Sequence, residues 1–198
     1  MRKLNINPDA YDVILADCPW NFKTYGKSDA NTPQTNYPTM SLKDIEELPI
    51  KQMTAVNCVM FFWVVDWLKP SVCEKIVNAW GFTYRTRAWV WVKAKPSGFG
   101  FHVGRGYYTQ SNPEDCWLCV KGSMPVSSRS ITSLIYSPVQ EHSRKPEDQF
   151  RKIEALYPKQ KYPRRLELFS RRSHAGWDAF GNEVRDSIVL PKVQVREA

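Results

Sequence analysis

Apolar residues along the chain fall into short runs that stop at polar or aromatic clusters. The runs at residues 13–16 and 58–65 are continuously apolar and rich in β-branched or aromatic side chains, which is typical of strands buried on both faces. Shorter or alternating segments predict further strands at residues 82–93, 114–121, 131–136 and 166–169. Helical spacing predicts helices that begin at Pro70 and Pro146, and Ser41 is placed to cap a third.

Two polar segments between these elements, residues 21–40 and 95–113, show no hydrophobic periodicity and predict long loops. Long loops in compact domains are often functional. The tyrosines of the first loop could either stack on a base or anchor the loop to the core. The second loop is basic and aromatic, which suits contact with a nucleic-acid backbone and its bases. The side chains concerned are Tyr25, Tyr37, Lys95 and Arg105.

The first apolar run ends at Asp17, which leads the sequence Asp-Cys-Pro-Trp. In open α/β sheets, ligands bind beyond the carboxyl ends of the strands, so this carboxylate is well placed for chemistry. A strand that simply ends in a turn would give the same apolar pattern.

The four residues suit methylation of the exocyclic amine of a base, whose nitrogen is a poor nucleophile because its lone pair is delocalised into the ring. Two acceptors for its two N–H groups would free that lone pair. The Asp17 carboxylate supplies one, and the carbonyl of Cys18, held extended by the following Pro19, supplies the other. Trp20 could then stack on the base.

Lys145 stands immediately before the proline that begins a predicted helix. Its ammonium adds to the positive end of the helix dipole, and together they favour an anionic group at this position. The alternative is a solvated lysine without a ligand. In either case we expect a surface cation that contributes little to folding stability.

A net charge of +8 favours a polyanionic partner such as nucleic acid. The 198 residues are most simply one domain. No segment resembles a signal peptide or approaches the ~18 apolar residues of a membrane span, so we expect a cytoplasmic protein without a membrane partner. The five cysteines lie in or beside apolar segments, as expected of reduced, buried thiols. Cys116 and Cys119 lack the second pair or histidine of a zinc site, so we expect no metal.

Six motifs resemble, in the same order, those of the MT-A70 family of adenine-N(6) methyltransferases, in which DCPW corresponds to Asp-Pro-Pro-Trp. They are DCPW, NYPTMS, the NPE at residues 112–114, HSRKP, LELFSRR and GWDAFGNE. The resemblance covers residues 11–184. It implies an α/β, Rossmann-like fold that uses S-adenosylmethionine, with a mostly parallel central sheet flanked by helices and a permuted motif order. We assign residues 1–184 to a single methyltransferase domain and residues 185–198 to a C-terminal tail.

The resemblance also implies roles for individual residues. The catalytic turn would be Asp17, Cys18, Pro19 and Trp20. Asp17 and Lys145 would face the cofactor, Lys145 at its carboxylate. Its adenosine and ribose would be surrounded by Glu167, Phe169, Arg171, His174, Asn182 and Glu183. The substrate side would comprise Trp20, Tyr25, Tyr37, Lys95, Arg105 and Asn112. Cys18 stands where the family has its first proline, and Glu183 stands where some members have glutamine.

These patterns predict transfer of a methyl group from S-adenosylmethionine to the exocyclic N(6) amine of adenine in nucleic acid. We favour DNA over RNA because the chain is compact and shows no accessory RNA-binding domain. The alternatives are RNA adenine-N(6) methylation, DNA cytosine-N(4) methylation, in which the motif more often begins with serine, and a catalytically silent nucleic-acid-binding subunit. The retention of Asp17 argues against the last. The oligomeric state stays open, with a dimer among the options.

Overall fold

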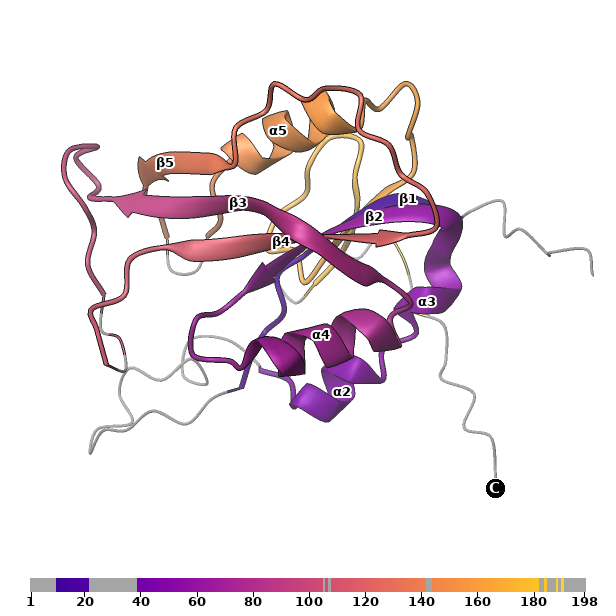
Figure 1. The fold of residues 1–198 in the computed structure, drawn as a ribbon, viewed down its shortest axis with the longest axis horizontal. Coiled ribbons are helices and arrows are strands. Elements are labelled where there is room, and N and C mark those ends of the chain that lie inside the picture. Colours follow the sequence, from indigo (N-terminus) through magenta and orange to yellow (C-terminus); the bar gives the residue numbers. More distant parts are fainter. Residues whose placement is uncertain are drawn as a thin grey trace, which may run out of the picture.

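The computed structural model describes residues 10–21, 39–104, 106, 108–141, 144–181, 184, 188 and 190. They form one seven-stranded sheet with helices on both faces (Figure 1). The strands are β1 (Tyr11–Ala16), β2 (Thr54–Val64), β3 (Thr83–Ala94), β4 (Glu114–Lys121), β5 (Leu134–Pro138), β6 (Arg165–Leu168) and β7 (Asp178–Phe180). The helices are α2 (Leu42–Glu46), α3 (Ile50–Met53), α4 (Pro70–Ala79) and α5 (Asp148–Leu156).

The strand order is β5-β3-β4-β2-β1-β6-β7, and every neighbouring pair is parallel except the two that β4 makes. The predicted mostly parallel α/β sheet is therefore confirmed. The chain leaves β1 for β2 on one side, and only after α5 does it return to β6 on the other. This reversal makes the carboxyl end of β1 the topological switch point, where open α/β sheets bind their ligands.

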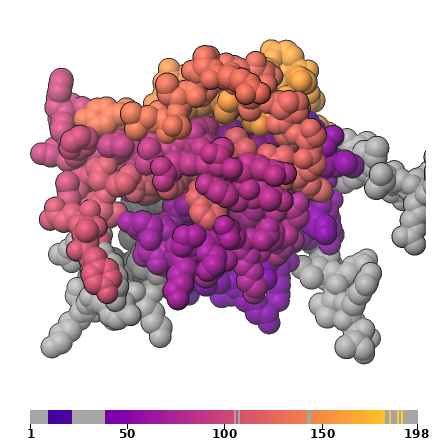
Figure 2. All heavy atoms as spheres, in the orientation of Figure 1, coloured from indigo at the N-terminus to yellow at the C-terminus, as the bar shows by residue number. Residues whose placement is uncertain are grey.

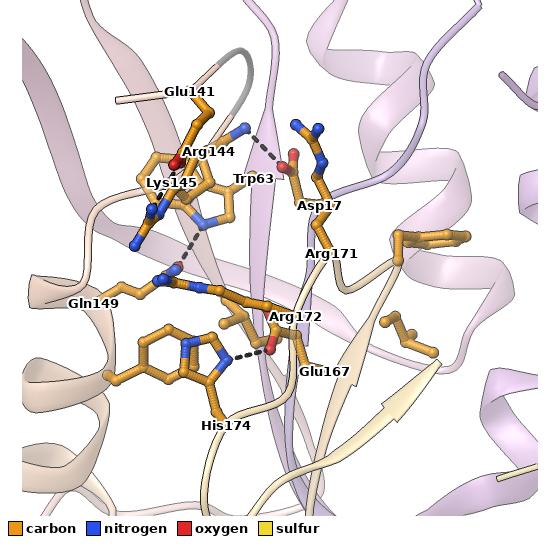
Figure 3. Close-up of a pocket in the computed structure, with 14 residues that line it drawn as sticks. Asp17, Trp63, Glu141, Arg144, Lys145, Gln149, Glu167, Arg171, Arg172 and His174 are labelled. Atoms are coloured by element: carbon orange, nitrogen blue, oxygen red, sulfur yellow. Dashed lines mark hydrogen bonds and ion pairs between the residues drawn. The ribbon is translucent and has the colours of Figure 1, made fainter. Parts of the chain in front are cut away.

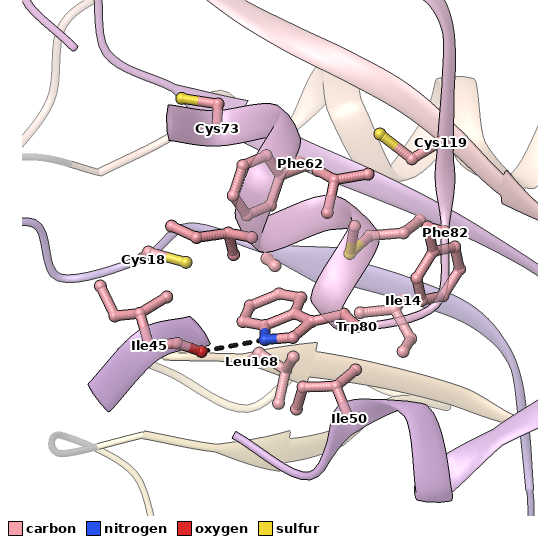
Figure 4. Packing of buried hydrophobic residues seen from close by; sticks show 14 of the residues in the cluster. Ile14, Cys18, Ile45, Ile50, Phe62, Cys73, Trp80, Phe82, Cys119 and Leu168 are labelled. Carbon is pink, nitrogen blue, oxygen red and sulfur yellow. Dashed lines mark hydrogen bonds between the residues drawn. The ribbon is translucent and has the colours of Figure 1, made fainter. Parts of the chain in front are cut away.

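The sheet separates two apolar clusters because successive residues of a strand point to opposite faces. Ile14 and Phe62 face α2 and α4, whereas Val13 and Phe61 face α5. Figure 4 shows the first cluster, where the indole of Trp80 donates a hydrogen bond of 2.9 Å to the carbonyl of Ile45 and so joins α4 to the segment around α2. Both faces of β1 and β2 are thus buried, as their apolar runs predict.

The cysteine prediction is confirmed, because all five thiols are free and buried. Cys116 and Cys119 are three residues apart on β4, and their side chains therefore point into different clusters. Two thiols on opposite faces of a strand cannot share a metal ion. Within the part of the chain that the structure describes, no group of three or more metal-ligating side chains is present.

Some details differ from the sequence-based expectations. The strand expected at residues 131–136 is β5, Leu134–Pro138, and β7 was not expected at all. β7 has only three residues and is held by pairing with β6 and by a 2.7 Å hydrogen bond from the Tyr11 hydroxyl to Asp178. Among the described residues, no helix has the length and apolar character needed to cross a bilayer. The division at residue 184 stays a prediction.

Candidate active site

A pocket of about 280 Å³ opens at the switch point, beyond the carboxyl ends of β1 and β6 (Figure 3). Its walls come from four segments: the end of β1, the end of β2, the approach to α5 with its first turn, and the end of β6 with the loop that follows. The lining residues are Leu15, Asp17, Trp63, Glu141, Arg144, Lys145, Gln149, Phe150, Glu167, Leu168, Phe169, Arg171, Arg172 and His174. The pocket thus combines carboxylates, cations and aromatic rings.

A chain of alternating charges lies behind Asp17. The ammonium of Lys145 is 2.7 Å from Oδ2 of Asp17 and 3.2 Å from Oε2 of Glu114. On its far side, Glu114 also contacts the ammonium of Lys93 at 2.5 Å. The Lys145 side chain is only 10% exposed, whereas the Asp17 carboxylate, at 30%, keeps a face toward the pocket. Our expectation that Lys145 is a surface cation was therefore wrong, because residues distant in sequence enclose it.

The two carboxylates on Lys145 respond differently to their surroundings. Burial raises the pKa of Asp17, and the ammonium of Lys145 offsets this only in part, while the nearby charges of Glu114 and Glu167 raise it further. Burial would also raise the pKa of Glu114, but Lys145 and Lys93 together bring it below its ordinary value. Burial would lower the pKa of Lys145, yet Asp17 and Glu114 raise it above its ordinary range. Lys145 is therefore a permanent cation at neutral pH.

The turn after Asp17 is seated in the apolar cluster on the α2 side of the sheet. The carbonyl of Cys18 accepts a hydrogen bond of 2.9 Å from the Trp20 amide, and the carbonyl of Pro19 accepts one of the same length from Met40. A carbonyl oxygen has two lone pairs, so the Cys18 carbonyl can still accept an N–H from a substrate. Burial raises the pKa of the Cys18 thiol well above its ordinary value, which keeps it neutral.

Trp20 does not lie where base stacking would place it. Its side chain is 3% exposed, and its ring packs edge-on against Phe62, with 5.8 Å between the ring centroids. In this structure the indole therefore belongs to the core, and the prediction that it stacks on a base is not supported. A large apolar ring beside two buried strands gains more from burial than from an exposed position.

The opposite wall of the pocket is formed by Glu167 and His174. Nδ1 of His174 lies 2.9 Å from Oε2 of Glu167, and the imidazole packs on the ring of Phe150 at 3.8 Å between centroids. Phe169 turns the chain out of β6 with a φ of 62°, a left-handed conformation that is uncommon for a bulky residue. Gly181 lies so close to the backbone of Ser170 that a Cβ there would be 2.0 Å from its carbonyl oxygen. These contacts fix the path of the loop that carries His174.

The structure brings together six of the predicted site residues, since Asp17, Lys145, Glu167, Phe169, Arg171 and His174 all line the pocket. It places two others elsewhere: Lys95 is exposed, and Asn112 bonds to the backbone of Lys93 instead of facing the pocket. Tyr25, Tyr37, Arg105, Asn182 and Glu183 lie outside the described residues. The individual roles of the six pocket residues stay predictions.

Several residues of the site were missed. Glu114 lies within the NPE motif and Arg144 within HSRKP, so the motifs contained both without indicating what they do. Gln149, in the first turn of α5, accepts a 2.8 Å hydrogen bond from the buried indole of Trp63. No local pattern indicates these contacts, because each joins segments distant in sequence.

Comparison with known proteins identifies the family. A family model described as MT-A70 matches residues 11–183. The chain belongs to the MT-A70 family. A type II methyltransferase, M.MunI of Mycoplasma sp, is 29% identical over 197 residues, which cover 89% of this chain and 79% of the relative.

Two longer relatives come from eukaryotes. An N(6)-adenosine-methyltransferase MT-A70-like protein of Arabidopsis thaliana is 27% identical over 177 residues, covering 88% of this chain but 24% of its own length. The human N(6)-adenine-specific methyltransferase METTL4 is 27% identical over 189 residues, covering 88% of this chain and 37% of its own length. Family membership confirms the predicted methyltransferase class and its cofactor, S-adenosylmethionine.

The residues of the pocket fit this cofactor. Lys145 and Arg144 supply cations for a carboxylate, and the carboxylate of Glu167 can accept hydrogen bonds from ribose hydroxyls. Phe169 and Phe150 supply apolar faces for a purine ring. When bound, S-adenosylmethionine supplies an activated methyl group for transfer to a nucleophile.

Proposed function

We propose that the protein methylates the exocyclic N(6) amine of adenine in DNA. The observation that carries this proposal is the placement of Asp17, whose carboxylate reaches the pocket from the switch point while Lys145 holds its other side. An amine that donates one N–H to Asp17 and the other to the Cys18 carbonyl has its lone pair freed from the ring. Both acceptors belong to adjacent residues of one turn, where the backbone places the carbonyl and Lys145 holds the carboxylate.

Asp17 also suits the proton transfer that must follow. Once the amine has gained a methyl group, its nitrogen carries a positive charge and must release a proton. A carboxylate whose pKa is raised by burial accepts that proton more readily than a solvated aspartate does. Lys145 remains charged throughout and keeps the carboxylate in place.

The adenine and DNA parts of the proposal draw on different relatives. The names of the plant and human relatives specify N(6) methylation of adenosine or adenine, which supports adenine as the acceptor. The type II methyltransferase supports DNA, because the chain spans 79% of it and only 24% of the plant adenosine methyltransferase. Methylation of RNA, or of cytosine at N(4), would be distinct outcomes of the test below.

The test is to incubate the protein and labelled S-adenosylmethionine with DNA and with RNA of the same sequence, and then to identify the modified nucleosides by mass spectrometry. We expect N(6)-methyladenine in DNA. Asp17→Asn should lower the rate about 10³-fold while cofactor affinity, measured by calorimetry, changes little, because the loss falls on the transition state. Asp44→Asn, at an exposed position on α2, is the control and should retain full activity. An active Asp17→Asn variant would refute the mechanism.

A further inference from the structure

Four exposed apolar side chains lie on β5 and on the segment after β3, at one side of the sheet. Phe99, Phe101, Leu134 and Tyr136 are 84, 60, 52 and 48% exposed. We call these four side chains, with the neighbouring Lys95, the aromatic patch. Figure 2 shows this end of the molecule as a protrusion at the left of the view. Aromatic rings exposed to this degree and clustered together usually mark a binding surface.

Contacts between β5 and the segment after β3 hold part of the aromatic patch in place. Ile135 of β5 points into the core, so Leu134 and Tyr136 on either side of it point to the opposite face of the sheet. The ring of Phe101 meets that of Tyr136 edge-on, with 6.1 Å between centroids and 82° between planes. The Tyr136 hydroxyl also donates a hydrogen bond of 3.4 Å to the carbonyl of Gly100. Loop and strand therefore hold each other's aromatic rings in place.

Lys95 adds a cation to the loop that carries Phe101. Its amide donates a 3.0 Å hydrogen bond to the Gly100 carbonyl, and its side-chain carbons lie 4.0 Å from where a Cβ of Gly100 would be. The same carbonyl accepts the hydrogen bond from the Tyr136 hydroxyl, so Gly100 connects the backbone of Lys95 to the ring of Tyr136. Aromatic faces combined with a cation are what proteins use to bind single-stranded nucleic acid, because bases stack and phosphates pair with the charge.

A second copy of the chain is a weaker candidate for this surface. A stable interface buries about 800 Å² on each partner, whereas four partly exposed side chains offer on the order of 500 Å². A protein interface also favours a centre depleted of lysine. The overall charge of +8 is complementary to a polyanion and opposes self-association.

The aromatic patch and Asp17 lie at the same end of the strands, the carboxyl end of β1 and β3. β1 and β3 point in the same direction, so the segment after β3 and the turn after β1 are at the same edge. Measured across the sheet, the order β5-β3-β4-β2-β1 places the segment after β3 three strand spacings from the turn after β1, or about 14 Å, and β5 four spacings from it, or about 19 Å. At ~3.4 Å per stacked nucleotide, these distances correspond to about four to six nucleotides, and to fewer when bases are splayed apart.

We infer that the aromatic patch binds unpaired bases that flank the target adenine, so that the substrate is single-stranded or locally unpaired on that side. This inference rests on the proposed function, because it takes the acceptor to be part of a polynucleotide. The patch does not touch the reacting atoms. It supplies affinity and sets which strand conformation can reach Asp17.

The test measures binding by fluorescence anisotropy with the full-length protein and three DNA probes. These are a 21-nucleotide single strand with a central adenine, a 5-nucleotide strand, and the 21-base-pair duplex. Phe101→Ala should weaken binding of the long single strand about tenfold, with little change in the affinity for the short strand or the duplex. Phe101→Trp should restore binding, because it retains an aromatic face. Lys95→Ala should also reduce the salt dependence of long-strand affinity, by a slope of ~0.7.

Val56→Ala is the matched control. Val56 is an apolar residue that is 50% exposed, and it lies near the amino end of β2, at the opposite end of the strands from the aromatic patch. It should change none of the three affinities. Equal loss on short and long strands, or no loss with Phe101→Ala, would overturn the inference. A shift of oligomeric state in sedimentation with unchanged DNA affinity would assign the surface to a second copy instead. The binding test does not depend on catalysis. If the protein methylates neither DNA nor RNA but Phe101→Ala still weakens long-strand binding, the proposed function is refuted and the binding role of the aromatic patch stands.

Discussion

On one side of the turn at residues 17–20 lies a chain of charges, and on the other lies an apolar cluster. The charged side is assembled from side chains of segments far apart in sequence, with Lys145 between Asp17 and Glu114. The apolar side holds Cys18 and Trp20 by burial and by hydrogen bonds between backbone groups. One carboxylate therefore depends on distant partners, while the carbonyl next to it depends on its own local backbone.

This contrast predicts how the two sides tolerate substitution. On the charged side, removing one member leaves its neighbours with uncompensated charge in a partly dry environment. On the apolar side, the functional group is a carbonyl that every residue type possesses. Side-chain identity should therefore matter much more at Lys145 and Glu114 than at Cys18. Three substitutions test this, in decreasing order of expected effect.

Lys145→Ala should destabilise the protein by about 3–5 kcal/mol, because it leaves Asp17 and Glu114 facing each other without their shared cation. Lys75→Ala is the matched control. Its ammonium lies 2.8 Å from the carboxylate of Glu46, close to the 2.7 Å between Lys145 and Asp17, but the Lys75 side chain is 70% exposed. That pair should contribute no more than about 1 kcal/mol. Urea unfolding measures both values, and similar losses for the two variants would contradict the contrast between buried and exposed pairs.

Glu114→Gln should lower the rate at pH 7 by no more than about tenfold, and should move the acidic limb of the pH–rate profile to lower pH. The sign follows from Asp17, which must be ionised to accept the amine. The charge of Glu114 is one of the causes that raise the pKa of Asp17, so its removal lowers that pKa. Single-turnover rates at saturating cofactor, measured over a range of pH, give the position of the acidic limb. An unchanged limb, or one shifted to higher pH, would show that the two carboxylates are not coupled through Lys145.

Cys18→Ala should have the smallest effect, with transfer within about tenfold of the wild type, or ~1.4 kcal/mol of barrier. The thiol is buried and neutral, and thiolates are the nucleophilic form of cysteine. Cys73→Ala, which removes another buried thiol from the same cluster, controls for packing loss. If Cys18→Ala is inactive while Cys73→Ala is active, the thiol has a chemical role and the backbone argument fails.

The sequence predicts strands better than it predicts their partners. Residues 114–121 were expected as a strand and form β4 with those bounds, but nothing in their composition shows that β4 runs opposite to its neighbours. Direction depends on which strands meet, and that is decided by contacts across the whole chain. β7 escaped prediction because three residues are too few to show periodicity.

The candidate site shows the same limit. A carboxylate at a strand end and an anion-binding position before a helix could both be inferred locally, and the structure places Asp17 and Lys145 together in one pocket. That they pair with each other could not be inferred, because 128 residues separate them. The burial of Trp20 could not be predicted, because a tryptophan after a catalytic motif can pack in a core or stack on a base, and only the surrounding packing decides between the two.

The reversed direction of β4 has a consequence for how this fold can diversify. Because β4 begins where β3 ends, the segment between them is a hairpin that departs from the catalytic edge and returns to it. The amide of Asn112 fastens the root of the hairpin to both backbone groups of Lys93, at 3.2 and 2.9 Å. Everything beyond that root can lengthen, shorten or change sequence without altering the sheet register or the charges around Asp17. The hairpin can therefore differ between homologues or engineered variants while the sheet and the charges around Asp17 stay the same.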